Sequence, residues 1–228
     1  MTPVDVKAAI AGDIRAMRRV ARLKQGPVAT MLADIAVRTC SRHVANQAAA
    51  SLSRRDKDRA AIAAMANVLR ATPADDETGG FEWCASALAK RKEPAALRAA
   101  IASYRAMPPG RARYFLVLGL SNRTERDKSL RKNAAFVQMM MDVVKDSNEE
   151  DARGAAIWAL WRLAHPRSMP LMLELLETDA DPYVRTTAAR ALAAIGGKRA
   201  VAALRPFLAT CTDDDLVAEL TPRLRSKG

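Results

Sequence analysis

Residues 181–208 read DPYVRTTAARALAAIGGKRAVAALRPFL, and this stretch decides the fold. Its apolar residues recur at three- and four-residue spacing, which places them on one face of each of two short helices. The first set is Val184, Ala188, Ala191, Leu192 and Ile195, and the second is Ala200, Val201, Leu204 and Leu208. Gly196 and Gly197 predict the turn between the helices, because glycine adopts the left-handed conformation that ends a helix. Neither helix buries its apolar face alone, so this hairpin requires packed neighbours on both sides.

The neighbour on one side repeats the pattern upstream. Residues 149–176 read EEDARGAAIWALWRLAHPRSMPLMLELL, and Arg153 precedes its counterpart Arg185 by 32 residues. The same shift pairs Leu160 with Leu192, and it also pairs Leu163 with Ile195 and Leu176 with Leu208. Self-similarity at a fixed period of this size is typical of a helical solenoid.

The acidic-x-x-x-Arg start, the alanine-rich first helix and the short turn of these two segments resemble a HEAT repeat. They are most similar to the HEAT-like repeats of phycobilisome-lyase-type proteins. The resemblance implies an all-α fold, a right-handed α-solenoid of about six HEAT-like helical hairpins in a single repeat domain, residues 1–228. The expected units are approximately 4–38, 41–72, 79–107, 110–146, 148–178 and 181–209, with a C-terminal cap at 212–228.

Composition agrees with an all-helical chain. Half of the residues are hydrophobic, aromatic residues make up only 4%, and no stretch alternates with period two for long. Upstream of the clear repeats, the apolar spacing predicts one amphipathic helix over 4–23 and its partner over 28–38. The following predicted pairs are 42–52 with 56–71, 81–91 with 94–107, and 111–121 with 129–145, followed by a final helix over 213–226 that Pro222 interrupts.

The net charge of +12 is concentrated toward the N-terminus. Residues 1–72 carry 13 basic and 5 acidic side chains (+8), residues 73–147 carry 13 and 9 (+4), and residues 148–228 carry 11 and 11 (zero). Such an asymmetry predicts an anionic partner for the N-terminal part. Arginines outnumber lysines 27 to 10, which suits bidentate contacts to carboxylate or phosphate groups.

The basic residues also follow the repeat. Turns within a hairpin are basic and turns between hairpins are acidic, which predicts one basic and one acidic edge. A row of helix N-termini flanked by arginine and lysine favours anion binding, and a solvated edge is the alternative. The candidate partner-binding residues are Arg15, Arg18, Arg19 and Arg22 on the first helix, and Arg54, Arg55, Lys57, Arg59, Lys90, Arg91, Lys92, Arg123, Arg126 and Lys128 near the turns.

The sequence gives no catalytic residue, no metal ligand set and no cofactor motif. His43 and His165 lack a cysteine or carboxylate partner at metal-ligand spacing. Trp83, Trp158 and Trp161 are interpreted as core residues. DNA glycosylases that act on alkylated bases share this helical build, yet no catalytic aspartate with flanking tryptophan and arginine is recognisable here.

Three functions follow as hypotheses. The first is a non-catalytic HEAT-repeat scaffold or adaptor that binds a macromolecule, an acidic protein above all, through its concave face and basic edge. The second is a nucleic-acid-binding protein, or a divergent glycosylase of alkylated DNA, that contacts phosphates with its N-terminal arginines. The third is a lyase-like or chaperone-like partner of an enzyme complex. A cytoplasmic location without membrane insertion is expected for all three, because the three cysteines are scattered and no apolar run is long enough to span a bilayer.

Overall fold

The computed structural model describes residues 3–23, 27–55, 58–71, 80–146 and 150–227. Within these ranges every regular element is an α-helix or a short 3-10 helix, and no strand occurs. The all-α prediction is therefore confirmed. The chain divides into two compact units, Met1–Leu120 and Ser121–Gly228. The expectation of a single repeat domain over 1–228 stays a prediction.

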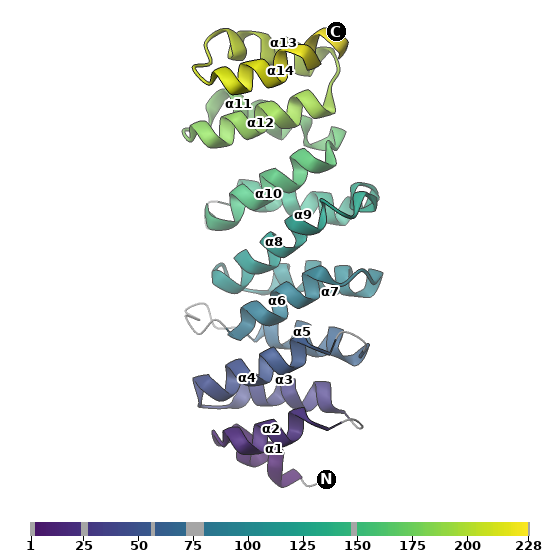
Figure 1. Ribbon diagram of the computed structural model, residues 1–228, viewed down its shortest axis with the longest axis vertical. Coiled ribbons are helices and arrows are strands. Elements are labelled where there is room, and N and C mark those ends of the chain that lie inside the picture. Colours follow the sequence, from purple (N-terminus) through teal and green to yellow (C-terminus); the bar gives the residue numbers. More distant parts are fainter. Residues whose placement is uncertain (1–2, 24–26, 56–57, 72–79, 147–149, 228) are drawn as a thin grey trace. The chain divides into compact units, whose positions relative to one another are not determined.

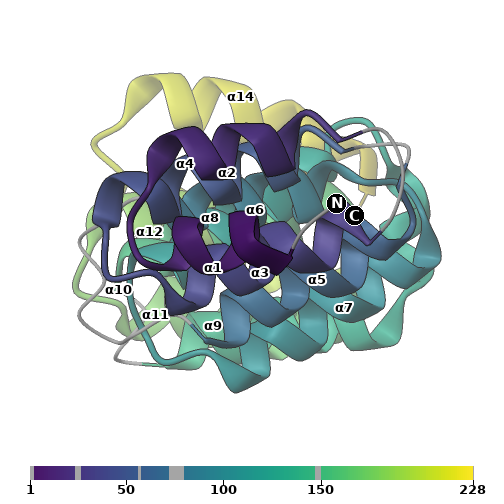
Figure 2. The same cartoon turned by 90° about the horizontal axis from the view of Figure 1, so that it is seen from below.

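The first unit is a stack of helices in two layers. Helices α2, α4 and α6 lie side by side in one layer, and α3, α5 and α7 pack behind them (Figures 1 and 2). Helix α1 packs against both α2 and α3. The helices are α1 (Pro3–Ile10), α2 (Ile14–Ala21), α3 (Val28–Arg38), α4 (Arg42–Ser53), α5 (Ala60–Arg70), α6 (Gly80–Lys90), α7 (Pro94–Ala106) and α8 (Arg111–Arg123), of which α8 ends in the second unit.

The second unit has the same construction. Helix α12 packs between α10 and α14 in one layer, and α11 packs against α13 in the other. Its elements are η1 (Lys128–Lys132), α9 (Ala134–Lys145), α10 (Glu150–Leu163), η2 (Pro166–Ser168), α11 (Met169–Thr178), α12 (Pro182–Ile195), α13 (Lys198–Ala209) and α14 (Asp214–Lys227). Stacked helical hairpins of this kind form an α-solenoid, as the sequence predicts.

The predicted apolar faces form the core between the layers. Leu160 and Leu192, the corresponding residues of the two clearest repeats, are both fully buried. Gly196 and Gly197 have φ angles of 76° and 90°, which confirms the glycine turn. Met139 and Met140 of α9 are buried in this core.

The prediction of one continuous helix over 4–23 is wrong. The chain forms α1 and α2 instead, separated by Gly12 and Asp13. Gly12 has a φ of 101°, which an L side chain adopts only with strain. The Asp13 carboxylate then accepts hydrogen bonds from the backbone N–H groups of Arg15 and Ala16, so it caps the N-terminus of α2. Gly12 and the Asp13 cap thus interrupt the helix, although the apolar spacing continues on both sides of them.

Other helix ends also differ from prediction. Helix α5 begins at Ala60 and not at residue 56, and α9 begins at Ala134 and not at residue 129. The Asn133 side chain accepts from the N–H of Phe136 and caps α9, while residues 128–132 form the 3-10 helix η1. Helix α14 continues through Pro222. Helix α7 begins at Pro94, as predicted.

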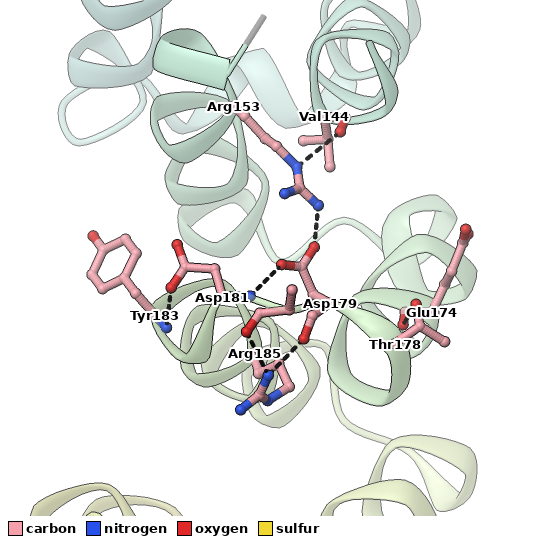
Figure 3. Close-up of polar contacts among 9 residues, drawn as sticks. Val144, Arg153, Glu174, Thr178, Asp179, Asp181, Tyr183 and Arg185 are labelled. Carbon is pink, nitrogen blue, oxygen red and sulfur yellow. Dashed lines mark hydrogen bonds and ion pairs between the residues drawn. The ribbon is translucent and has the colours of Figure 1, made fainter. Parts of the chain in front are cut away.

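The repeated arginine has a structural role in the second unit (Figure 3). The Arg153 guanidinium donates to the carbonyl oxygen of Val144 at 3.2 Å and forms an ion pair with Asp179. Arg185, its counterpart one repeat later, donates to the carbonyl oxygens of Asp179 and Ala180 at 2.6 and 3.1 Å. These bonds satisfy carbonyl groups at the ends of α9 and α11. The repeated arginine is therefore explained by its hydrogen bonds to helix ends and turns.

Candidate anion-binding site

Four arginines line one hollow between α2 and α4. This hollow, the arginine cleft, has a volume of about 370 Å³ and is lined by Met17, Arg18, Ala21, Arg22, Gln47, Ser51, Arg54 and Arg55. Arg18 and Arg22 lie four residues apart on α2, and Arg54 and Arg55 follow the end of α4. No carboxylate of the described residues lines the cleft or forms an ion pair with these arginines. Among the described residues, the cleft is therefore a positive site that no carboxylate compensates.

Arg18, Arg22 and Arg54 are exposed, whereas Arg55 is partly fixed by the fold. The Arg55 guanidinium donates to the carbonyl oxygen of Leu23 at 2.9 Å and to that of Ala21 at 3.4 Å. Arg54 donates to the Ser51 hydroxyl at 3.4 Å. These bonds leave guanidinium donors at the cleft, because each guanidinium carries five N–H groups.

Arg91 occupies the corresponding turn of the next hairpin but is buried, with 8% of its surface exposed. It donates to the carbonyl oxygens of Arg55 and Asp58 at 3.3 and 3.2 Å, and its Nε lies 3.6 Å from the Glu93 carboxylate. Arg91 thus ties the α6–α7 turn to the α4–α5 turn. Because Arg91 is buried and donates to backbone carbonyl groups, its role is to stabilise the fold and not to contact a partner.

The remaining candidates of the first unit are spread over its surface. Arg15 is exposed on α2, and the exposed Arg19 forms an ion pair with Asp5 at 2.8 Å. Arg59 precedes α5 and lines a separate hollow between α5 and α7. Lys90 and Lys92 are exposed near the end of α6. Lys57 lies outside the described residues.

In the second unit the candidates are Arg123, Arg126 and Lys128. Arg123 donates from two nitrogens to one oxygen of Asp127, at 3.0 and 2.8 Å, and is largely buried. Lys128 donates to the carbonyl oxygen of Arg162 at 3.4 Å, and Arg126 is exposed. These three residues belong to the second unit, whereas the arginine cleft is lined by residues of the first unit.

Acidic side chains between hairpins act mainly as helix caps. Asp13, Asp181 and Asp213 each accept hydrogen bonds from backbone N–H groups at the start of a helix. The N–H of Ala16, followed by that of Arg15, lowers the pKa of Asp13. Capping and the helix dipole therefore explain these acids without a partner. The turn acids at 75–77 and 149 lie outside the described residues.

The interpretation of Trp83 as a core residue is wrong. Its side chain is 58% exposed on α6. It lines a hollow of about 490 Å³ between α4 and α6, the tryptophan hollow, together with Ser53, Ser86, Ala87, Lys90, Arg91 and Glu93. The sequence held a signal for this outcome, because Cys84, Ala85, Leu88 and Ala89 already supply the apolar face of α6 and all are buried.

Trp158 and Trp161 are half-buried on α10, so they too are not fully enclosed core residues. Their rings contact each other edge to face at 4.7 Å between centroids. The Trp158 indole N–H donates to the Tyr183 hydroxyl, and the Arg162 guanidinium lies 5.0 Å from the Trp158 ring centroid. These contacts join α10 to α12 at the surface of their layer.

The described residues contain little that resembles a catalytic centre. Burial raises the pKa of the Cys84 thiol to about 12, so this thiol stays protonated. His165 caps η2, where its Nδ1 accepts from the N–H of Arg167 at 3.2 Å. No group of three or more potential metal ligands occurs in the described ranges. None of the described helices is long and apolar enough to cross a membrane.

Paired helices stacked in two layers define a helical-repeat protein. Residues 137–221 match the family model of HEAT repeats. This match confirms the predicted resemblance to HEAT repeats in that part of the chain. HEAT repeats generally mediate protein–protein interactions as scaffolds. A comparison with curated proteins finds no match to this chain.

Proposed function

We propose that the protein is a non-catalytic HEAT-repeat scaffold that binds an acidic segment of a protein partner in the arginine cleft. The observation that carries the proposal is the convergence of Arg18, Arg22, Arg54 and Arg55 on one hollow that no described carboxylate lines. Like charges at helical spacing repel one another unless an anion compensates them. Carboxylates suit this role, because guanidinium groups bind them with paired hydrogen bonds.

The test compares two variants of equal net charge. The cleft variant carries Arg18→Gln, Arg22→Gln and Arg54→Gln, and the control carries Arg70→Gln, Arg98→Gln and Arg105→Gln on α5 and α7, where all three arginines are exposed. Binding of a fluorescein-labelled peptide rich in Asp and Glu is measured by fluorescence anisotropy. Exposed ion pairs contribute roughly 0.5 kcal/mol each, so three lost pairs predict an affinity about tenfold lower for the cleft variant.

The control variant should lose less than about threefold, because it keeps every cleft arginine and differs in net charge by the same amount. Circular dichroism should give wild-type helicity for both variants, since all six positions are exposed. Equal losses in the two variants would contradict the proposal, because the binding would then follow net charge alone.

Nucleic acid is the second candidate, since the same arginines suit phosphate oxygens. Phosphate contacts require that log affinity falls steeply with log salt concentration. An absence of binding to duplex and single-stranded oligonucleotides at about 50 mM salt would end this candidate. The other expectations remain predictions. They are the use of the concave face and of a continuous basic edge, a lyase-like or chaperone-like partnership, and a cytoplasmic location.

A further inference from the structure

The arginine cleft and the tryptophan hollow flank the same helix. Gln47, Ser51 and Arg54 line the cleft on the α2 side of α4, and Ser53 lines the hollow on the α6 side. Helices α2, α4 and α6 are consecutive members of one layer (Figure 1). A segment laid across the C-terminal end of α4 therefore contacts both sites.

The two sites differ sharply in charge. The arginine cleft has four guanidinium groups and no described carboxylate. The tryptophan hollow is lined by Lys90, Arg91 and Glu93, and Glu93 lies 3.6 Å from Arg91. Arg91 is buried and donates to backbone carbonyl groups, so Lys90 is the exposed cation of this hollow. The complementary ligand is acidic at one end and close to neutral at the other.

The exposed indole of Trp83 specifies the neutral end. A large ring that is 58% exposed leaves apolar area open to water. Aromatic pairs gain from edge-to-face or offset stacking beyond the area they bury. The hydroxyl groups of Ser53 and Ser86 also line the hollow and offer hydrogen bonds at its border. An aromatic side chain of the ligand meets these requirements.

Helix spacing fixes the distance between the two ends. Packed helices lie roughly 8–10 Å apart, and the two hollows occupy successive gaps of the layer. An extended peptide advances about 3.3 Å per residue, so about three residues separate the acidic group from the aromatic residue. A nucleic acid fits less well, because each nucleotide adds a phosphate, whereas the tryptophan hollow has one exposed cation, Lys90, and the carboxylate of Glu93.

We infer that the partner segment is an extended acidic peptide whose aromatic residue, about three positions from its acidic cluster, stacks on Trp83. The inference rests on the proposed function, since it takes the acidic cluster to lie in the arginine cleft. It adds the chemistry, the spacing and a second contact residue.

The experiment uses four labelled ligands, three of them peptides, and four forms of the full chain. One peptide carries an acidic cluster and a Phe three residues away, the second replaces the Phe with Ala, and the third moves the Phe next to the cluster. The fourth is a single-stranded oligonucleotide with the same label, which stands in for the competing ligand class. The protein forms are the wild type, Trp83→Ala, the cleft variant and Tyr183→Ala, which removes another exposed aromatic residue.

The wild type should bind the spaced Phe peptide about five- to tenfold more tightly than the Ala peptide and the adjacent-Phe peptide. Trp83→Ala should abolish that preference without changing the affinity for the Ala peptide, and Tyr183→Ala should leave it intact. The preference should persist at about 500 mM salt, where exposed charges are screened.

Each contrary result identifies what fails. Equal affinity of the wild type and Trp83→Ala for the spaced Phe peptide would overturn the inference. If the cleft variant alone lost affinity for this peptide, the proposed function would still stand. Loss in Trp83→Ala with none in the cleft variant would overturn the proposed function. If the oligonucleotide bound more tightly than the spaced Phe peptide, and this binding depended on Trp83, the inference would be overturned in favour of nucleic acid.

Discussion

The Arg55 guanidinium donates a 2.9 Å hydrogen bond to the carbonyl oxygen of Leu23, which lies 32 residues upstream in the preceding hairpin. Arg91 makes the equivalent connection to the carbonyl oxygen of Arg55, 36 residues upstream. Successive turns of the first unit are thus joined by arginine side chains that donate to backbone carbonyl groups. Basic turns in this solenoid have a structural role as well as a charge.

Replacement of Arg91 with Ala should destabilise the protein. The change removes two hydrogen bonds from a buried guanidinium to the carbonyl groups of Arg55 and Asp58, and hydrogen bonds that involve a charged group contribute about 1.5–3 kcal/mol. Urea denaturation measures the free energy of unfolding. Lys90→Ala is the control, since this neighbouring side chain is exposed and should change stability by less than about 0.5 kcal/mol. Similar values for the two variants would show that Arg91 does not support the stack.

Gly119 in α8 should not tolerate Ala. A Cβ at this position would lie 2.7 Å from the Cβ of Ala89 in α6, so the helices would have to separate. We expect Gly119→Ala to lower the melting temperature, with a cost of about 1–3 kcal/mol. Gly154 in α10 is the matched control, because no heavy atom beyond the adjoining backbone of its own helix lies within 4 Å of an added Cβ. Gly154→Ala should stabilise by about 0.5–1 kcal/mol through helix propensity.

Restoring space at the helix crossing tests the cause. The double variant Gly119→Ala with Ala89→Gly removes the clashing methyl group and should recover part of the loss, since the two positions are in contact. Strictly additive effects of the two substitutions would exclude the clash as the reason.

The ion pair of Arg153 with Asp179 should show energetic coupling. The Asp179 side chain is only 6% exposed and also accepts from the N–H of Asp181 at 3.0 Å. Asp179→Ala or Arg153→Ala should each cost about 1–3 kcal/mol, because a partly buried charged group loses its partner. In a double-mutant cycle the combined variant should cost less than the sum of the single variants. A coupling energy near zero would assign both effects to separate contacts.

Stability should depend on pH through His165. Burial, followed by the charges of Arg131 and Arg167, lowers the pKa of this imidazole below its ordinary value of 6.5. The unfolded chain then binds the proton more readily, so this contribution to stability is present above about pH 6.5 and is lost as the pH falls through the folded pKa. Protonation also removes the Nδ1 acceptor for the N–H of Arg167.

We therefore expect His165→Asn to reduce the difference in free energy of unfolding between about pH 7.5 and pH 5.5, since Asn can still cap η2. A pH dependence that survives His165→Asn in full would assign the titration to another group.

The repeat pattern predicted the architecture because the hydrophobic period and the glycine turn are local signals. Gly196 and Leu192 occupy the predicted turn and core. The break at Gly12 and Asp13 was also encoded locally, as a glycine followed by a helix cap, but the apolar spacing on both sides obscured it.

Side-chain roles at the candidate site were harder to predict. Arg55 and Arg91 occupy similar turns, yet Arg55 lines a cleft and Arg91 is buried. The difference arises from contacts 32 to 36 residues away in sequence, which depend on how successive hairpins stack. The exposure of Trp83 likewise depends on which residues of α6 meet α4, a property of packing and not of composition.

The arginine cleft spans the joint between two consecutive hairpins, and this gives it a mechanical consequence. A ligand that bridges Arg18 on α2 and Arg54 beyond α4 resists any bending that widens the joint. Coupling between two sites is reciprocal, so a force that opens the joint also weakens the grip on the ligand. The affinity for the partner and the resistance of this joint to bending are therefore thermodynamically coupled.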